Sequence, residues 1–458
     1  MIIKNCFYRI YQSVLLNVMH IVRYNHNVIS GNGAVCRIPG ILKKHNIKKV
    51  LVFTGPHLVK TSLFKKIIAM FREKGLECIV FSGISAETGT GSVEMAGKTY
   101  LQHKCNAIIA IGGGSVIDCA KAAAGSIVNP GKSIMRLAGY QKVRKKVPVI
   151  IAVPTTAGTG AEATACAVIK DDRTGVKKII ADTKIVPRYA VLDPVMTARM
   201  PGYLTAYTGM DALTHATESY LNKYSSKSSR ANAQAAVNLI IKNIIPAYYK
   251  TGGISPRKNM LDASYLAGCA FVRTSVGYVH AIGHAIGGRY NLPHGMVVAV
   301  VLPYVLEWYG ICIYAKLARL ADISGITEKN MSVEKKAKAY IIYIKRLNHK
   351  FGINKNFYKE LNNSIEKENM SLMVQTGDKE EDGNIKIAKD NSIKTCLTGK
   401  VHKNKGIAEK DIKKIAKCAI MEANPYYPVP KIMALKECEK LVYKIFTRQF
   451  ILPPDRKQ

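Results

Sequence analysis

The sequence predicts a two-part fold: an N-terminal α/β domain built on a parallel sheet, followed by an all-helical C-terminal domain. From Lys48 onward, short apolar runs rich in β-branched residues alternate with amphipathic segments of about a dozen residues. That alternation is typical of βαβ units around a buried parallel sheet. After about Pro194 the β-rich runs vanish, and Ala, Leu, Ile and Met recur at a spacing of three to four. We therefore expect one domain over 1–194 and a second over 195–458.

Each expected element follows from one of these runs. The expected strands are 48–55, 77–84, 106–111 and 147–156, and the expected helices between them are 58–74, 93–103 and 115–124. In the second domain, helical periodicity predicts helices at 206–221, 231–245, 260–271 and 277–287. The polar stretch 362–405 has weak periodicity and predicts a surface insertion or linker, after which 406–420 predicts one more amphipathic helix.

Charge is the unusual feature of the composition. The 458 residues contain 68 Lys and Arg against 31 Asp and Glu, which gives a net charge of +37, whereas the hydrophobic fraction of 48% is that of a globular protein. Such a surface attracts anions, including nucleic acid, acidic lipid headgroups and phosphorylated cofactors. The basic residues are spread along the whole chain without a nucleic-acid-binding motif, so we expect no specific nucleic-acid partner.

The cysteines and the N-terminal segment indicate the cellular compartment of the protein. The 11 cysteines include no CxxC pair, which favours reduced thiols and a cytoplasmic protein over disulfides or a zinc knuckle. Residues 11–22 are interrupted by polar side chains and lack a small-residue cleavage site, so we expect an amphipathic helix that covers the protein body. No other run approaches the ~20 apolar residues of a membrane span.

A glycine-rich turn is the first candidate site. Gly112, Gly113, Gly114 and Ser115 directly follow an expected strand and open an expected helix. Backbone without Cβ at such a turn lets phosphate oxygens approach N–H groups, and the helix N-terminus adds its positive dipole end. The turn therefore favours a bound diphosphate, although glycines here also permit tight helix–strand packing.

Histidines and a carboxylate form the second candidate site. Asp211 and His215 are four residues apart, as are His280 and His284, and each pair lies on one face of an expected helix. His294 follows at a Pro-Gly corner. Three imidazoles and one carboxylate can bind a divalent metal that acts as a Lewis acid, which leaves one histidine for proton transfer.

Four motifs in series resemble the iron-containing, or group III, alcohol dehydrogenases: GGGSVIDCAK at 112–121, PTTAGTGAEAT at 154–164, GMDALTHATE at 209–218 and GYVHAIGHAIGGRYNLPHG at 277–295. The resemblance implies a Rossmann-like dinucleotide domain followed by a helical metal-binding domain. It implies a metal held by Asp211, His215, His280 and His294, with His284 beside the nicotinamide as a proton relay. It also implies a dinucleotide site that includes Gly112, Gly113, Gly114, Ser115, Asp118, Thr155, Thr156, Thr164 and Lys177.

The chain departs from the family at the end of the expected strand 48–55. Many NAD-preferring members resemble it there but carry an aspartate that binds the adenosine ribose, where this chain has Gly55. Without that carboxylate a 2′-phosphate is no longer repelled. We therefore expect NADP to be preferred, with NAD possible. The metal is expected to be Fe²⁺, and ligand types also suit Zn²⁺.

The expected activity is reversible hydride transfer between a small alcohol or diol and nicotinamide, with the substrate oxygen on the metal. The expected partners are a small alcohol or aldehyde and further copies of the chain in a homodimer or higher homo-oligomer. Two alternatives stay open: a dehydroquinate synthase-like or glycerol dehydrogenase-like enzyme of the same superfamily, and a non-catalytic anion or nucleic-acid binder suggested by the charge. The sequence leaves the particular alcohol open.

Overall fold

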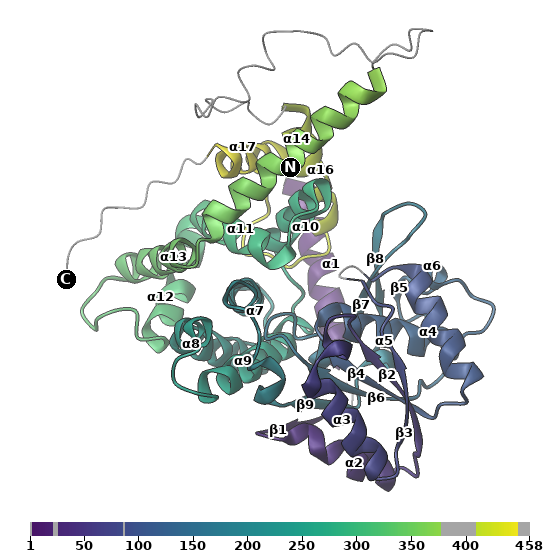
Figure 1. Cartoon of the computed structure of the whole chain (residues 1–458). Helices are drawn as coiled ribbons and strands as arrows, with labels where there is room; N and C mark the ends of the chain where they lie inside the picture. Colours follow the sequence, from purple (N-terminus) through teal and green to yellow (C-terminus); the bar gives the residue numbers. More distant parts are fainter. Residues whose placement is uncertain (1, 22–25, 86–87, 377–408, 448–458) are drawn as a thin grey trace, which may run out of the picture.

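The computed structural model of the chain describes residues 2–21, 26–85, 88–376 and 409–447. A sheet-based part and a helical part lie side by side (Figure 1). The α/β half with a parallel sheet and the helical half confirm the predicted fold class. The division at residues 194 and 195 stays a prediction.

The main sheet has six strands, all parallel, in the order β1-β9-β6-β4-β2-β3. The strands are β1 Asn27–Ser30, β2 Lys49–Thr54, β3 Glu77–Phe81, β4 Ala107–Gly112, β6 Val149–Pro154 and β9 Tyr189–Leu192. All four predicted strands are among them. The two strands that the sequence did not predict, β1 and β9, are only four residues long and extend the sheet beyond β6.

Alternate residues of each central strand face opposite layers of helices, as the strand geometry requires. Val50 and Val52 of β2 pack with Phe71 on one face, whereas Leu51 and Phe53 pack with helix residues of the other face. The first layer contains α2 Ile38–Lys44 and α3 Ser62–Glu73, and the second contains α4 Thr90–Gln102, α5 Gly114–Ile127 and α6 Ile134–Leu137. Burial on both faces explains why these strands read as continuous apolar runs.

A second sheet of three short strands was missed by the sequence analysis. Its order is β5-β8-β7, with β5 Gly139–Tyr140, β7 Cys166–Lys170 and β8 Lys177–Ala181. The first three residues of β8 are exposed, and two of them are lysines. Because these exposed residues include two lysines, β8 lacks the apolar run from which the strands of the main sheet were predicted.

The helical part begins with a helix that is buried on nearly every side. Sixteen buried residues are found in α7 Gly202–Leu221 alone. The remaining helices are α8 Lys227–Tyr249, α9 Ser255–Phe271, α10 Tyr278–Tyr290, α11 His294–Tyr309, α12 Tyr314–Ile323, α13 Val333–Lys350, α14 Ile353–Thr376, α16 Glu409–Ala423 and α17 Leu435–Phe446. All helices predicted in this part are present. One large apolar cluster joins them.

The expected insertion or linker over 362–405 begins inside a helix, and the insertion itself stays a prediction. Helix α14 continues to Thr376, because Asn, Glu and Lys are tolerated on the exposed side of a helix even where apolar periodicity is weak. Residues 377–405 lie outside the described residues. The predicted helix after residue 406 is confirmed as α16.

One described stretch, His294–Ile323, is long and apolar enough to cross a membrane by length and composition. However, 72% of its most apolar window is buried inside the protein. It contains α11, whose residues belong to the large apolar cluster of the helical part. This stretch is therefore a core segment of the fold.

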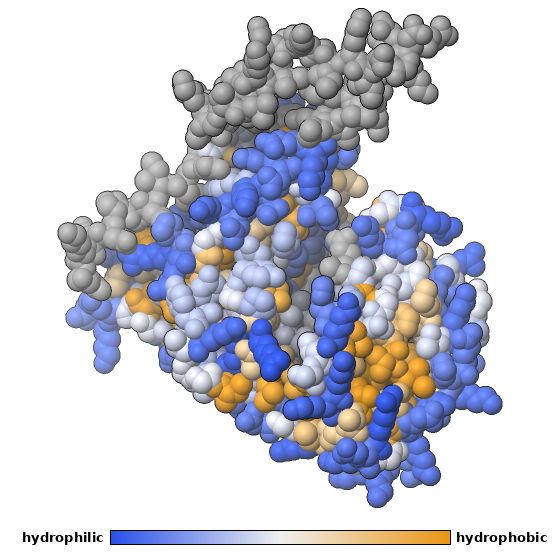
Figure 2. All heavy atoms as spheres, viewed as in Figure 1, coloured by the Kyte–Doolittle hydropathy of each residue, from blue (hydrophilic) through white to orange (hydrophobic). Residues whose placement is uncertain are grey.

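The predicted N-terminal helix is present as α1 Ile2–Ile21, but the side that faces the protein is not apolar. Among its described side chains, Asn5, Tyr8, Arg9, Gln12 and Ser13 are buried or half-buried. Residues 5–14 therefore contact the body through a polar side, and the predicted segment 11–22 lies within this helix up to residue 21. Most of the face of the molecule seen in Figure 2 is hydrophilic, with an apolar area over the sheet-based part.

Candidate metal and dinucleotide site

The glycine-rich turn joins β4 to α5 at the carboxyl edge of the main sheet. Gly112 ends β4, and Gly113 is the N-cap of α5. A Cβ on Gly114 would lie 2.9 Å from Thr159 Oγ1, and one on Gly112 would lie 2.5 Å from Val116 Cβ. Positions 112 and 114 therefore require glycine, because any side chain there would collide with Val116 or Thr159. The open N-terminus of α5 is also the kind of place where a phosphate binds to backbone N–H groups.

Three other predicted cofactor residues share this edge. Because β2, β4 and β6 are parallel neighbours, the residues that follow them come together. Gly55 follows β2, and Thr155 and Thr156 follow β6. Thr155 N–H donates to the Gly112 carbonyl at 3.0 Å. The sheet topology therefore gathers these residues around the turn.

The remaining predicted cofactor residues have other contacts. Asp118 accepts a hydrogen bond from Val168 N–H at 3.0 Å, and burial raises its pKa to about 6. The Thr164 hydroxyl accepts from the buried Lys121 ammonium at 2.9 Å. Lys177 is exposed in β8, in register with Lys170. Asp118 and Thr164 thus hold α5 against the following strands, and Lys177 does not lie in the turn itself.

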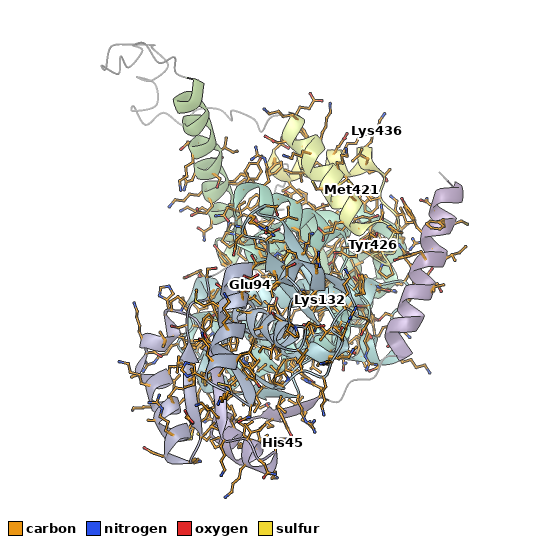
Figure 3. All side chains as sticks on the ribbon, turned by 90° about the vertical axis from the view of Figure 1, so that its right-hand side faces the viewer. His45, Glu94, Lys132, Met421, Tyr426 and Lys436 are labelled. Carbon is orange, nitrogen blue, oxygen red and sulfur yellow. The ribbon has the colours of Figure 1, made fainter. Side chains whose placement is uncertain are left out.

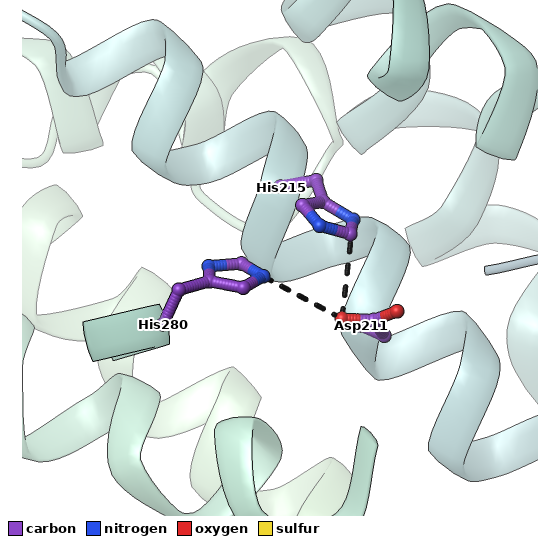
Figure 4. Close-up of side chains that lie close together, drawn as sticks. All are labelled: Asp211, His215 and His280. Carbon is purple, nitrogen blue, oxygen red and sulfur yellow. Dashed lines mark ion pairs between the residues drawn. The ribbon is translucent and has the colours of Figure 1, made fainter. Parts of the chain in front are cut away.

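The predicted metal ligands converge from three helices. Asp211 and His215 lie one turn apart on α7, His280 lies on α10, and His294 begins α11. Asp211 Oδ1 is 3.9 Å from His215 Nδ1, 3.6 Å from His280 Nε2 and 3.4 Å from His294 Nε2. Figure 4 shows the first three side chains pointing toward one another. Asp211, His215 and His280 are buried, whereas the His294 side chain is 40% exposed.

The donor atoms of this cluster fit a metal ion. Asp211 Oδ1, His215 Nδ1 and His280 Nε2 are buried atoms without a hydrogen-bond partner among the described residues. Three unpartnered polar atoms buried within 4.8 Å of one another would be costly without a bound group. Burial lowers the pKa of His215 to about 3, which keeps this ring neutral and able to donate a lone pair. Nearby histidines hold the pKa of Asp211 well below its usual range despite burial.

Glu218 orients His280 and was not predicted from the sequence. Its carboxylate lies 2.6 Å from His280 Nδ1 and accepts from the N–H groups of Gly277 and Val279. Burial alone would lower the pKa of His280, but Asp211 and Glu218 together raise it to about 9. This pKa puts a second proton on Nε2 at neutral pH. A bound divalent cation would displace that proton, and the Nδ1 proton shared with Glu218 would keep the Nε2 lone pair aimed at the cluster. The available signal was the spacing: Glu218 is three residues after His215, on the same side of α7.

His284, the predicted proton relay, lies beside the cluster rather than in it. Its ring stacks on that of His294 with centroids 5.1 Å apart. His284 Nδ1 is 2.7 Å from Glu422 Oε1, and Tyr427 donates its hydroxyl to the same oxygen at 2.7 Å. Neither Glu422 nor Tyr427 was predicted, because they lie more than a hundred residues away in the chain and no local pattern points to them.

The glycine-rich turn and the predicted metal ligands are close neighbours. The backbone of Gly158 lies close enough to His215 to raise the pKa of its ring slightly against the larger effect of burial. Gly158 belongs to the segment after β6 that also contributes Thr155 and Thr156. A Cβ on Gly158 would lie 2.7 Å from the Thr208 carbonyl oxygen of α7. The helix with two of the predicted ligands therefore packs directly against the predicted cofactor segment. Both candidate sites belong to one region of the molecule.

A single methyl group tests how closely α11 must approach α7. A Cβ on Gly295, next to His294, would lie 2.4 Å from the Tyr207 carbonyl oxygen. We expect Gly295→Ala to push the start of α11 away and separate His294 from Asp211, which lowers kcat/KM by about 10²-fold. Gly288→Ala in α10 is the matched control, because a Cβ there meets nothing within 4 Å. Equal kcat/KM and metal content in the two variants would contradict this role of the contact.

A parallel-sheet domain with a glycine-rich strand–helix turn, next to a buried cluster of histidines and a carboxylate, defines the class of metal-dependent, dinucleotide-linked enzymes. Comparison with known families agrees. A family described as iron-containing alcohol dehydrogenase matches residues 25–194, and the C-terminal part of the Fe-containing alcohol dehydrogenase family matches residues 205–400. The chain belongs to the iron-containing alcohol dehydrogenase family. It is therefore an oxidoreductase of the metal-dependent alcohol dehydrogenase type.

Individual relatives support the same assignment. An NAD-dependent methanol dehydrogenase of Bacillus methanolicus is 34% identical over 347 residues, which span 76% of this chain and 90% of that protein. A 1,3-propanediol dehydrogenase of Klebsiella pneumoniae is also 34% identical, over 76% of this chain and 87% of its own length. Among solved structures, a 1,3-propanediol oxidoreductase has a TM-score of 0.79 at 28% identity and covers 93% of this chain and 100% of its own.

Proposed function

We propose that this enzyme interconverts a small alcohol or diol and its aldehyde, with Asp211, His215, His280 and His294 holding the metal. The observation that carries the proposal is the convergence of unpartnered buried atoms from Asp211, His215 and His280. A divalent ion in that position supplies a Lewis acid for the alcohol or carbonyl oxygen. The relatives named for methanol and 1,3-propanediol support a short, unbranched substrate.

The chain's own residues perform the remaining tasks in this proposal. Glu218 fixes the ring of His280. The partly exposed His284 exchanges a proton between the substrate side and solvent, and Glu422 holds its ring in place. The turn at Gly112, Gly113, Gly114 and Ser115 receives the diphosphate of the cofactor, with Thr155, Thr156, Asp118, Thr164 and Lys177 as the other proposed cofactor residues.

Three further features belong to the proposal. Fe²⁺ is proposed over Zn²⁺ because of the family, and elemental analysis of the purified protein distinguishes them. A cytoplasmic location is supported by the ten cysteines of the described ranges, all of which are free thiols. The two-domain division at 194 and 195 and a homodimer or higher homo-oligomer complete the proposal.

The direct test measures metal content and then the consumption of reduced nicotinamide with short aldehydes and with 3-carbon hydroxyaldehydes. We expect net oxidation of the reduced cofactor that a chelator abolishes and Fe²⁺ or Zn²⁺ restores. A dehydroquinate synthase-like lyase uses nicotinamide only transiently and would show no net consumption. Binding to DNA without any metal would instead favour the non-catalytic alternative.

NADP is the proposed preferred coenzyme, and Gly55 is the residue that supports it. A Cβ at Gly55 meets nothing within 4 Å, so an added side chain fits at the end of β2 without a clash. We expect Gly55→Asp to lower the ratio of kcat/KM for NADP over NAD at least about tenfold, which needs only about 1.4 kcal/mol of repulsion. The neutral Gly55→Asn is the matched control, and it should change the ratio much less. An unchanged ratio in Gly55→Asp would contradict the assignment.

A further inference from the structure

Helix α1 precedes the part of the chain that matches the family, which begins at residue 25. Its polar side is attached to the body. Gln12, which is fully buried, donates to the Tyr427 carbonyl at 2.8 Å, and the Arg9 guanidinium donates to the carbonyls of Val429 and Pro430 at 2.6 and 3.0 Å. The polar groups that a surface helix normally offers to water are thus used to anchor the helix.

The opposite side of α1 carries an apolar stripe that faces away from the protein. Phe7, Ile10, Tyr11 and Val14 follow the i, i+3, i+4, i+7 spacing of one helix face. Their exposed fractions are 61%, 65%, 36% and 59%. Figure 3 shows α1 at the edge of the molecule, next to the segment that carries Tyr426. Tyr11 contacts Tyr426 edge to face, with ring centroids 5.8 Å apart, which extends the stripe by a second half-exposed tyrosine.

The two chain segments that contain the stripe and the basic loop carry charge of one sign. The first 72 residues contain no Asp or Glu, and neither do residues 119–161. The second of these segments lies near the stripe, because the pKa of Tyr140, raised mainly by burial, is raised further by Tyr11 and Tyr426 nearby. The loop that follows Tyr140 exposes Lys142, Arg144, Lys145 and Lys146. An outward apolar helix face next to a basic loop is the combination found in peripheral membrane helices.

We propose that the stripe of Phe7, Ile10, Tyr11 and Val14, together with the basic loop at 142–146, binds the surface of an anionic lipid bilayer. The apolar side chains would enter the region between headgroups and acyl chains, and the loop would lie at the charged headgroups. A second copy of the chain is the less favourable occupant of this surface, because two copies that meet through it would bring their basic loops at 142–146 together. The proposed homo-oligomer is therefore expected to use another surface. This inference is independent of the chemistry at the metal cluster.

Sedimentation of the full-length protein with vesicles tests the proposal. The vesicles contain either phosphatidylcholine alone or phosphatidylcholine with phosphatidylglycerol. We expect binding to the mixed vesicles at low salt that weakens as salt rises, and at least tenfold weaker binding to the neutral vesicles. The double variant Ile10→Ser and Val14→Ser should lower the affinity for the mixed vesicles at least tenfold. Phe7→Ser, tested alone, should lower it several-fold.

The matched control replaces two exposed apolar residues elsewhere, Leu101→Ser and Ile311→Ser, whose exposed fractions are 59% and 85%. We expect the control to bind vesicles like the unchanged protein, and all variants to keep its thermal unfolding midpoint. Arg144→Glu with Lys145→Glu should remove the preference for anionic vesicles. The proposal is overturned if the unchanged protein does not bind mixed vesicles, or if the helix variants bind them equally well. It is also overturned if light scattering shows that the helix variants convert a dimer into a monomer while vesicle binding stays unchanged.

Discussion

His280→Ala should abolish stable metal binding and lower kcat/KM by on the order of 10³-fold, because a Lewis acid contributes several kcal/mol to such a reaction. His280 lies 2% exposed between Asp211 and Glu218, and its Nε2 has no other partner among the described residues. Elemental analysis after dialysis and a coupled assay of nicotinamide reduction measure the two effects on one preparation.

The substitution also leaves Glu218 without its imidazole partner, so part of the loss could come from unfolding. Asp211→Asn separates these causes, because it keeps the shape of the side chain and removes only the charge that faces the three imidazoles. His103→Ala is the matched control, since that histidine is exposed just after α4. A well-folded Asp211→Asn protein with full metal content and full activity would refute the metal cluster.

The parts of the site that could be predicted from the sequence have local causes. Strand β4, the glycine turn and α5 are adjacent in the chain, and the spacing of Asp211 and His215 follows from one helix turn. Partners from distant segments were missed because no period or motif connects them. Glu422 meets His284 only because α16 packs on α10, and that packing depends on the whole apolar cluster of the helical half.

The orientation of α1 shows a different limit of sequence reasoning. Periodicity correctly predicts an amphipathic helix, but it does not decide which face meets the protein. The usual expectation is that the apolar face packs inward. Here the carbonyl groups of Tyr427, Val429 and Pro430 provide acceptors that select the polar face through Arg9 and Gln12. These acceptors lie in a segment some four hundred residues further along, so no local pattern could have indicated them.

The buried lysine behind the glycine turn carries the second large expected effect. Lys121 is fully buried and donates to the carbonyls of Ala161 and Cys166 and to the Thr164 hydroxyl. Asp118 lies 3.9 Å from its ammonium group. Because Lys121→Met removes the cation and leaves these acceptors buried, we expect the free energy of unfolding to fall by about 3–5 kcal/mol in urea titrations.

The pH dependence of that loss separates charge from packing. Burial raises the pKa of Asp118 to about 6 and that of Glu162 to about 7, so both carboxyls are charged only above these values. The penalty of Lys121→Met should therefore be larger at about pH 8 than at about pH 5, where the carboxyls are protonated and need no cation. Lys98→Met, at an exposed position of α4, should cost under about 0.5 kcal/mol at either pH. A pH-independent loss would mean that Lys121 acts through its carbonyl and hydroxyl partners rather than through the two acids.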